Sequence, residues 1–233
     1  RHEIAVLELG TNHFGELAAL CRICEPTHGL VTCIGREHLE FFKNLSWVAK
    51  AEFELYGWLA SHGGFVFGLG SDPWIRGYLE PGAARFPASR FRLYEVSTPF
   101  PLTGMNSRST GGVPHRVPCA VQAESLGFDR SFHPLMHFSS RGKRLFQARV
   151  GALGRAGQLA ATAAVAVGLH FGVKGKTLAA RLVSYKPSSS KRMQLLRLGG
   201  ATFINDAYNS NPDSLRLGLE SIAEYPCRGR KQL

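Results

Sequence analysis

Residues 3–13, EIAVLELGTNH, decide the fold class that the sequence predicts. The apolar run from Ile4 to Leu7 is followed by Glu8 and closed by Gly10, a pattern that predicts a buried strand with a carboxylate at its carboxyl end. An ionised carboxylate in an apolar strand is costly unless it is paired or binds a metal, and ligands collect at the carboxyl ends of strands in open α/β sheets. Glu8 is therefore the first candidate site residue; the alternative is a strand-end Glu that pairs with a nearby Arg.

The residues that follow predict a βαβ opening. Apolar side chains within 15–23 have the spacing of a short helix, and residues 29–35 (GLVTCIG) have the pattern of a second buried strand. This order of elements predicts a parallel sheet. His38 then stands just beyond the second strand, at the sheet edge expected for Glu8, so two side chains able to bind a metal should converge there.

The rest of the chain continues the α/β pattern. The expected elements are a helix at 47–60 with Ser46 as its N-cap, strands at 65–67 and 91–96, an irregular or β-rich insertion within 97–150, helices at 157–168 and 176–185, strands at 193–198 and 201–204, and a helix at 214–224. Residues 187–191, PSSSK, have linker composition and predict a boundary between domains 1–187 and 188–233. The predicted fold is a mostly parallel sheet flanked by helices, followed by the start of a second domain.

Composition narrows the class of protein and its compartment. The 233 residues, 44% hydrophobic, suffice for one large core or two small ones, and no apolar run approaches the roughly 18 residues of a membrane span. The first residues do not resemble a signal peptide. Five cysteines without a regular framework indicate reduced thiols, and Cys21 and Cys24 fall on an apolar helix as core residues. We therefore expect a cytoplasmic protein.

The net charge of +11 predicts an anionic partner, which could be a nucleotide, a nucleic acid or an acidic metabolite. The basic residues are scattered and form no stripe with interleaved aromatic side chains, so nucleic acid is the least favoured of the three. We expect small-molecule partners, with no nucleic acid and no membrane.

Four segments, taken in order, resemble the Mur ligases. They are AVLELGTNHFGEL (5–17), VTCIGREHLEFF (31–42), AEFELYGWL (51–59) and FINDAYNSNPDSL (203–215). The last is similar to the family members that add D-alanyl-D-alanine to a UDP-N-acetylmuramoyl tripeptide. The resemblance implies a central ATP-binding domain over 1–187 and the opening of a Rossmann-like C-terminal domain over 188–233. It also implies that the family's N-terminal domain and P-loop lie upstream of Arg1, so we expect a fragment that lacks both.

The resemblance also implies a reaction and its residues. ATP phosphorylates a substrate carboxylate, and an amine attacks the acyl phosphate, with Mg²⁺ and cationic side chains offsetting the phosphate charge. The implied roles are Mg²⁺ binding by Glu8 and His38, contact of Arg192 with ATP phosphate, nucleotide contact by Asp206, Tyr208, Asn209, Asn211 and Asp72, and a place beside the substrate channel for Asn12 and His13. Of these, Glu8, His38 and Arg192 are the expected catalytic residues. We expect a monomer.

Some positions depart from the family pattern. Glu52 stands where the family carries a carbamylated lysine, so it is either a third metal-site carboxylate or a solvated helix residue. Leu69 replaces an Asn and Cys33 replaces another. Two alternatives to the ligase therefore stay open: a related amide ligase of the folylpolyglutamate or cyanophycin type, and a non-catalytic nucleotide-binding domain.

Overall fold

A six-stranded sheet forms the centre of the larger unit of the protein. The computed structural model describes residues 2–37, 39–80, 86–97, 118–187, 191–225, 227 and 229–230. In spatial order the strands are β1 (His28–Val31), β2 (Phe65–Leu69), β3 (Phe91–Val96), β4 (Val121–Phe128), β5 (Pro134–Ser140) and β6 (Lys143–Arg149). β1 to β4 pair in parallel, whereas β4, β5 and β6 pair antiparallel. The predicted α/β class is confirmed.

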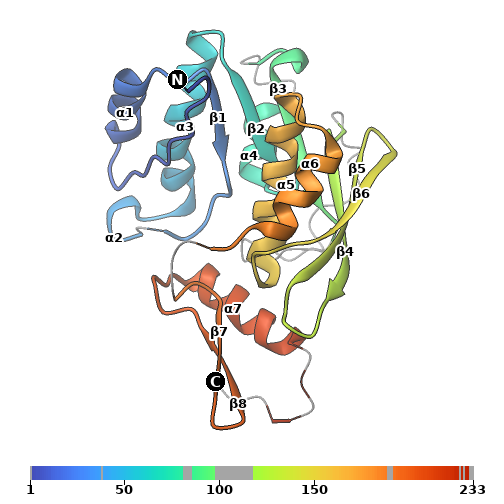
Figure 1. Ribbon diagram of the computed structural model, residues 1–233. Coiled ribbons are helices and arrows are strands. Elements are labelled where there is room, and N and C mark those ends of the chain that lie inside the picture. Colours follow the sequence, from blue (N-terminus) through green and yellow to red (C-terminus); the bar gives the residue numbers. More distant parts are fainter. Residues whose placement is uncertain are drawn as a thin grey trace.

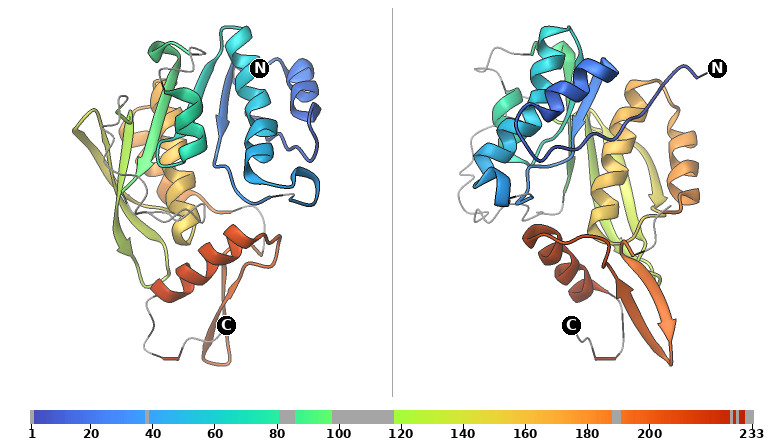
Figure 2. Two further views of the ribbon diagram at one scale, coloured as in Figure 1. Left: turned by 180° about the vertical axis from the view of Figure 1, so that it is seen from behind. Right: turned by 90° about the vertical axis from the view of Figure 1, so that its left-hand side faces the viewer.

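Helices cover both faces of this sheet (Figure 1). α3 (Leu45–Ser61) and α4 (Pro73–Leu79) lie on one face, and α5 (Gly154–His170) lies on the opposite face. Both views in Figure 2 show this arrangement. The shorter elements are α1 (Glu16–Cys24), which packs on α3, α2 (Leu39–Phe42), a 3₁₀ turn at Ala88–Arg90, and α6 (Gly175–Ser184), which packs beside β6.

Tyr56 of α3 forms hydrogen bonds to the sheet within the core. Its side chain is fully buried, and its hydroxyl donates to the Phe67 carbonyl at 2.6 Å while accepting from the Val31 amide at 3.3 Å. Burial raises the pKa of this phenol well above its ordinary value, because the phenolate would lose its hydration. One helix residue thus contacts two neighbouring strands near their carboxyl ends.

A second, smaller unit lies beyond the carboxyl ends of the parallel strands (Figures 1 and 2). It comprises an antiparallel hairpin of β7 (Gln194–Leu198) and β8 (Ala201–Asn205), followed by α7 (Pro212–Glu224). Gly199 and Gly200 form the hairpin turn with φ of 56° and 79°, the left-handed conformations that a two-residue turn requires. Arg155 of α5 forms ion pairs with Glu220, at 3.4 Å, and Glu224, which hold α7 against the larger unit.

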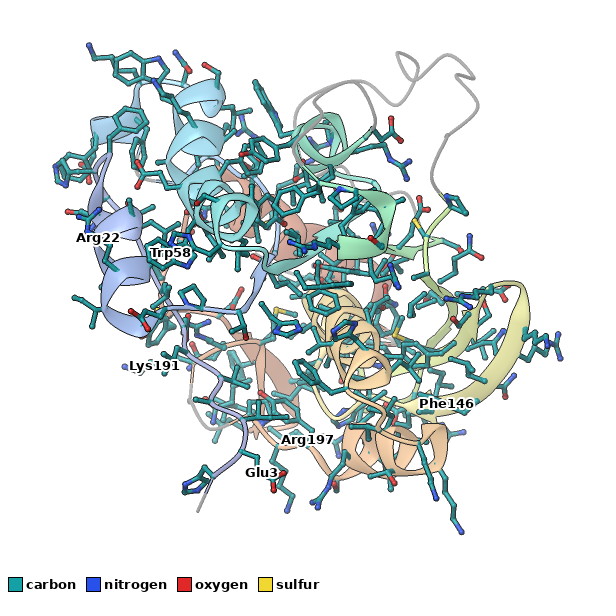
Figure 3. All side chains as sticks on the ribbon, turned by 90° about the horizontal axis from the view of Figure 1, so that it is seen from above. Glu3, Arg22, Trp58, Phe146, Lys191 and Arg197 are labelled. Carbon is teal, nitrogen blue, oxygen red and sulfur yellow. The ribbon has the colours of Figure 1, made fainter. Side chains whose placement is uncertain are left out.

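The strand predicted over residues 4–7 is wrong. Ile4, Val6 and Leu7 are 57%, 91% and 60% exposed, and the segment runs without strand pairing among the described residues. Figure 3 shows Glu3 at the margin of the molecule, at the outer end of this segment. A strand requires a neighbour for its backbone groups, and β1 pairs with β2 on its described side; the apolar pattern alone cannot supply that neighbour.

Two further predictions need correction. The second strand ends at Val31 rather than residue 35, because the Ile34 amide donates to Asp72 at 2.8 Å instead of joining the sheet. The N-cap of α3 is Asn44 rather than Ser46: Asn44 accepts from the Trp47 amide at 3.2 Å, and Ser46 only donates to that cap at 2.7 Å.

The other predicted elements are confirmed to within a few residues, and β3 has the predicted bounds. The insertion is β-rich over 121–149, while residues 98–117 and the linker residues 188–190 lie outside the described residues. Cys21 is buried in the core as expected, and Cys24 is half-buried. Among the described residues, none of the helices has the length and apolar character needed to span a membrane.

The amino end of α1 is capped from another helix. Its own N-cap is Gly15, which has no side chain to offer. Glu54 of α3 supplies the acceptor: one carboxylate oxygen accepts from the Gly15 amide at 2.7 Å and the other from the Ala18 amide at 3.0 Å. A carboxylate at this position also opposes the positive end of the helix dipole. Glu54 therefore fixes α1 on α3.

We expect Glu54→Ala to lower the free energy of unfolding by about 1–2 kcal/mol, because the substitution removes a cap and two charge-assisted hydrogen bonds. Urea denaturation measures this loss, and amide exchange should accelerate at Gly15 and Ala18. Glu40→Ala removes an exposed carboxylate of α2 and is the matched control. Equal stability of the two variants would contradict the capping role.

Candidate functional site

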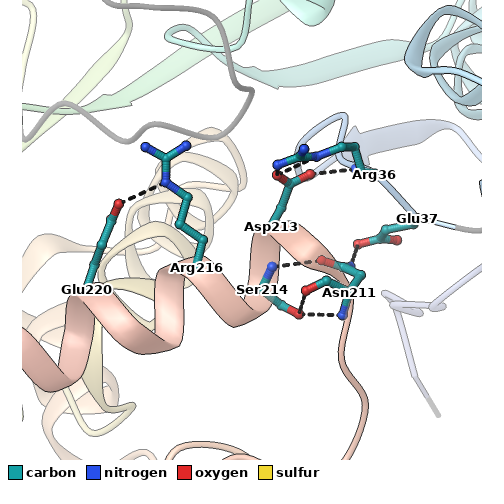
Figure 4. Close-up of polar contacts among 7 residues, drawn as sticks. All are labelled: Arg36, Glu37, Asn211, Asp213, Ser214, Arg216 and Glu220. Carbon is teal, nitrogen blue, oxygen red and sulfur yellow. Dashed lines mark hydrogen bonds and ion pairs between the residues drawn. The ribbon is translucent and has the colours of Figure 1, made fainter. Parts of the chain in front are cut away.

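The carboxyl ends of β1, β2 and β3 lie at one edge of the sheet, and the amino end of α7 faces this edge (Figure 1). Arg36, five residues after β1, contacts Asp213 of α7 at this edge. Asp213 accepts from the Arg36 amide at 2.7 Å, from Nε at 3.0 Å and from Nη2 at 2.6 Å (Figure 4). The side chains are 36% and 11% exposed, so the Asp213 carboxylate is largely withdrawn from water.

Asn211 links the start of α7 to the same loop. Its side-chain oxygen accepts from the Ser214 amide at 2.7 Å, and the Ser214 hydroxyl accepts from the Asn211 amide at 2.9 Å, which is a capping box. Its side-chain nitrogen remains as a donor and reaches Glu37 at 3.3 Å (Figure 4). A residue of the predicted nucleotide-facing loop thus meets the neighbour of His38.

Glu52 of α3 is a partly buried carboxylate that interacts with the carboxylates of Glu37 and Glu54. Burial, followed by the charges of the Glu37 and Glu54 carboxylates, raises the pKa of Glu52 to about 7. Burial also raises the pKa of the Cys33 thiol to about 12, with Glu37 as the next cause. A cation bound beside Glu52 would offset the cost of ionising this carboxylate.

Asp72 is a carboxylate of a different kind. It is fully buried; one oxygen accepts from the Ile34 amide at 2.8 Å, and the other accepts from the amides of Trp74 at 2.9 Å and Ile75 at 3.1 Å. Burial raises its pKa, and these three hydrogen bonds oppose that rise. Asp72 joins the loop after β1 to the start of α4, so its contribution to a cofactor site would come through the position of these loops.

The remaining loop residues gather around the hairpin. The Arg192 guanidinium lies over the Tyr208 ring, 4.2 Å from its centroid, and the Tyr208 amide donates to the Lys191 carbonyl at 3.1 Å. Asp206 accepts from the Met193 amide at 2.9 Å. Asp206, Asn209, Ser210 and Ser214 also line a small hollow between the hairpin and α7, together with Met193, Ile204, Leu215, Gly218, Leu219 and Ile222.

Asn12 and His13 lie elsewhere, over the start of α1. Glu16 accepts from the amides of Asn12 at 2.7 Å and His13 at 3.0 Å, and these bonds lower its pKa. Its second oxygen lies 3.1 Å from Nδ1 of His13, whose ring packs against Phe41 with centroids 4.8 Å apart. Both side chains are exposed and held in place by a backbone turn.

The prediction that the Glu8 and His38 side chains converge at one edge of the sheet is not tested by the described residues. Glu8 is exposed in the segment that does not form a strand, and His38 lies outside the described residues. Over the described ranges, no group of three or more His, Cys, Asp or Glu side chains has the arrangement of a metal site. The structure does bring together Arg192 with Tyr208, and Asn211 with the loop that precedes His38.

Sequence reasoning missed Arg36 and Glu37 as members of this site. Arg36 and Asp213 are separated by 177 positions, and neither has a local pattern that identifies the other. The one signal available was charge: an Arg-Glu pair directly before His38 and an Asp directly before a predicted helix.

Comparisons with known proteins find similar sequences and similar folds. Residues 1–86 match the Mur ligase middle domain. A UDP-N-acetylmuramoyl-tripeptide–D-alanyl-D-alanine ligase of Mycobacterium bovis is 30% identical over 224 residues, 96% of this chain but only 39% of that relative. MurF from Acinetobacter baumannii has a similar fold, with a TM-score of 0.72 and 22% identity over 96% of this chain and 43% of that one. A MurF ligase of Thermotoga maritima, determined in complex with ADP, gives a TM-score of 0.69 at 16% identity, covering 92% of this chain and 43% of that one.

We expect Asp213→Ala to release the amino end of α7 from the loop after β1, because it removes the carboxylate that accepts from the guanidinium and the backbone amide of Arg36. The free energy of unfolding should fall by about 1–3 kcal/mol, and limited proteolysis within 191–225 should accelerate. Arg216→Ala, on the same helix, breaks a 3.3 Å pair with Glu220 and leaves the Arg36 contact intact, so it is the control. Unchanged proteolysis in Asp213→Ala would refute the docking role.

The raised pKa of Glu52 predicts a pH dependence of stability. The pKa is 4.5 in the unfolded chain and about 7 in the folded one, so between these values only the folded state holds the proton. The free energy of unfolding therefore falls as pH rises from about 4.5 to about 7, and is flat above. In EDTA, Glu52→Gln should remove this slope and stabilise the protein at pH 8 by on the order of 1–3 kcal/mol. Urea denaturation across pH tests this, with Glu40→Gln as control; the same slope in Glu52→Gln would exclude Glu52 as its source.

Proposed function

We propose that the chain is a Mur ligase and forms part of an ATP-dependent ligase that adds D-alanyl-D-alanine to a UDP-N-acetylmuramoyl tripeptide during peptidoglycan precursor synthesis. The observation that carries this proposal is the similarity to the Mycobacterium bovis ligase, which runs through the sheet unit and the α7 unit alike. The chain spans about two fifths of that relative's length, so the reaction is proposed for the whole protein.

The proposed reaction has two steps. A carboxylate oxygen of the tripeptide attacks the terminal phosphorus of ATP and ADP leaves; the amine of D-alanyl-D-alanine then attacks the acyl carbon and phosphate leaves. Arg192 would contact the phosphates, since a guanidinium matches their geometry. Asp206, Tyr208, Asn209 and Asn211 would face the nucleotide, a role supported by the ADP held in the Thermotoga maritima relative and by the contact of Asn211 with the loop after β1.

Mg²⁺ fits the chemistry of the sheet edge. It prefers oxygen ligands, and the pKa of Glu52 is raised because this carboxylate is partly buried near Glu37 and Glu54. We assign Mg²⁺ to Glu8, His38 and Glu52, where the ion would neutralise phosphate charge during transfer. Glu52 would then replace the carbamylated lysine of the family with a carboxylate that needs no carbon dioxide.

The domain division and the cellular setting belong to the same proposal. Residues 1–187 would form the central domain and 188–233 the start of the C-terminal domain, with Asn12 and His13 beside the substrate. ATP and a UDP-linked substrate are cytoplasmic metabolites, so we expect the protein to act in the cytoplasm, as a monomer.

The test is phosphate release by the complete gene product, which should require both the UDP-linked tripeptide and D-alanyl-D-alanine. Glu8→Ala and His38→Ala should each lower turnover at least 10- to 100-fold, the usual cost of disturbing a metal's ligands. Glu3→Ala, in the same exposed segment as Glu8, should leave turnover unchanged. Turnover within a few-fold of the parent in both variants would overturn the metal assignment, and release that ignores D-alanyl-D-alanine would overturn the proposed reaction.

A further inference from the structure

Two histidines meet at the end of the sheet opposite the candidate site. His28 opens β1 and His170 closes α5, and their Nε2 atoms lie 3.1 Å apart. The two residues are 142 positions apart in the sequence. His28 pairs with Phe65, the first residue of β2, so the histidine pair lies at the amino ends of these strands.

Aromatic side chains hold both imidazole rings. The His170 ring lies 4.1 Å from the Phe65 ring, centroid to centroid, and 5.2 Å from that of Phe67. The His28 ring lies 4.8 Å from the Phe171 ring. The short approach of the two nitrogens is therefore built into the packing of α5 on the sheet.

The surroundings of both rings favour the neutral imidazole, which is the form that binds metals. Burial lowers the pKa of His28, and burial, then His28 and Arg92, lower the pKa of His170. Nδ1 of His28 lies 2.9 Å from the Thr27 hydroxyl. If Nδ1 carries the proton and donates it to this hydroxyl, Nε2 keeps its lone pair for a metal ion; a hydrogen bond from the other ring nitrogen is the usual arrangement of a metal-binding histidine.

We propose that His28 and His170 form a two-histidine site for a divalent transition metal of the Zn²⁺ class, with water completing the coordination. Two Zn–N bonds at the tetrahedral angle separate the nitrogens by about 3.3 Å, close to the observed 3.1 Å. Imidazole favours Zn²⁺, Ni²⁺ and Cu²⁺ over Mg²⁺, so this site is chemically distinct from the proposed magnesium site.

The site is open and of modest affinity. His170 is exposed, which gives a metal ion access. Among the described residues no third His, Cys, Asp or Glu completes a metal cluster, and the positive charge of Arg92 acts on His170. The metal would therefore bind reversibly and bridge β1 to the end of α5.

Titration calorimetry of the protein with Zn²⁺, in excess Mg²⁺, tests the proposal. His170→Gln should weaken one Zn²⁺ site at least 10-fold, because a chelating ligand is lost. His62→Gln is the matched control: His62 is also exposed and stacks on an aromatic ring, that of Trp58, at 3.8 Å. It should leave Zn²⁺ binding unchanged. Equal Zn²⁺ affinity in the parent and His170→Gln would overturn the proposal.

A second measurement counts the imidazole ligands of the metal directly. It needs no substitution of His28, whose ring packs against aromatic side chains. With less than one equivalent of Cu²⁺, electron paramagnetic resonance of the parent should show coupling to two imidazole nitrogens, and His170→Gln should show one at most. Coupling to a single imidazole, or to none, in the parent would equally overturn the proposal.

Discussion

Asp213 accepts three hydrogen bonds from Arg36, and this contact joins the amino end of α7 to the loop after β1. The contact combines two hydrogen bonds from the guanidinium to one carboxylate oxygen, a third from the backbone amide to the other, and the favourable position of an acidic residue in the first turn of a helix. Arg155 holds the other end of α7 through Glu220 and Glu224. Because α7 is held at both ends, the loop that precedes it, which ends at Asn211, stays close to the carboxyl ends of the parallel strands.

Two carboxylates at the same edge of the sheet have opposite character. Asp72 is satisfied by three backbone amides and stabilises the loops around it. Glu52 is partly buried near other carboxylates, and its pKa of about 7 records the cost of ionising it there. An uncompensated charge of this kind weakens the fold, and such features are typical of sites that bind a ligand. A cation would remove the cost, which is why the raised pKa and the proposed metal site support each other.

The sequence predicted local structure well where a single pattern was sufficient. The apolar strand β3 has the predicted bounds, and α7 begins two residues before its predicted start. The predictions failed where an equally good local pattern lacked a partner or had a rival. Residues 4–7 have the composition of a strand but no paired neighbour among the described strands. Asn44 and Ser46 are both good N-cap residues two positions apart, and the geometry of the turn selected Asn44.

By itself, the sequence determined the α/β class and the order of most elements, because periodicity and turn chemistry act over a few positions. Only the tertiary structure decided which distant groups meet: Arg36 with Asp213, Glu37 with Asn211, and His28 with His170. The tertiary structure also decided that Glu52 lies near other carboxylates, whereas Asp72 accepts hydrogen bonds from backbone amides. The physical reason is that hydrogen bonds and charge interactions require approach within a few ångströms, and only the packing of helices on a sheet brings together groups more than a hundred residues apart.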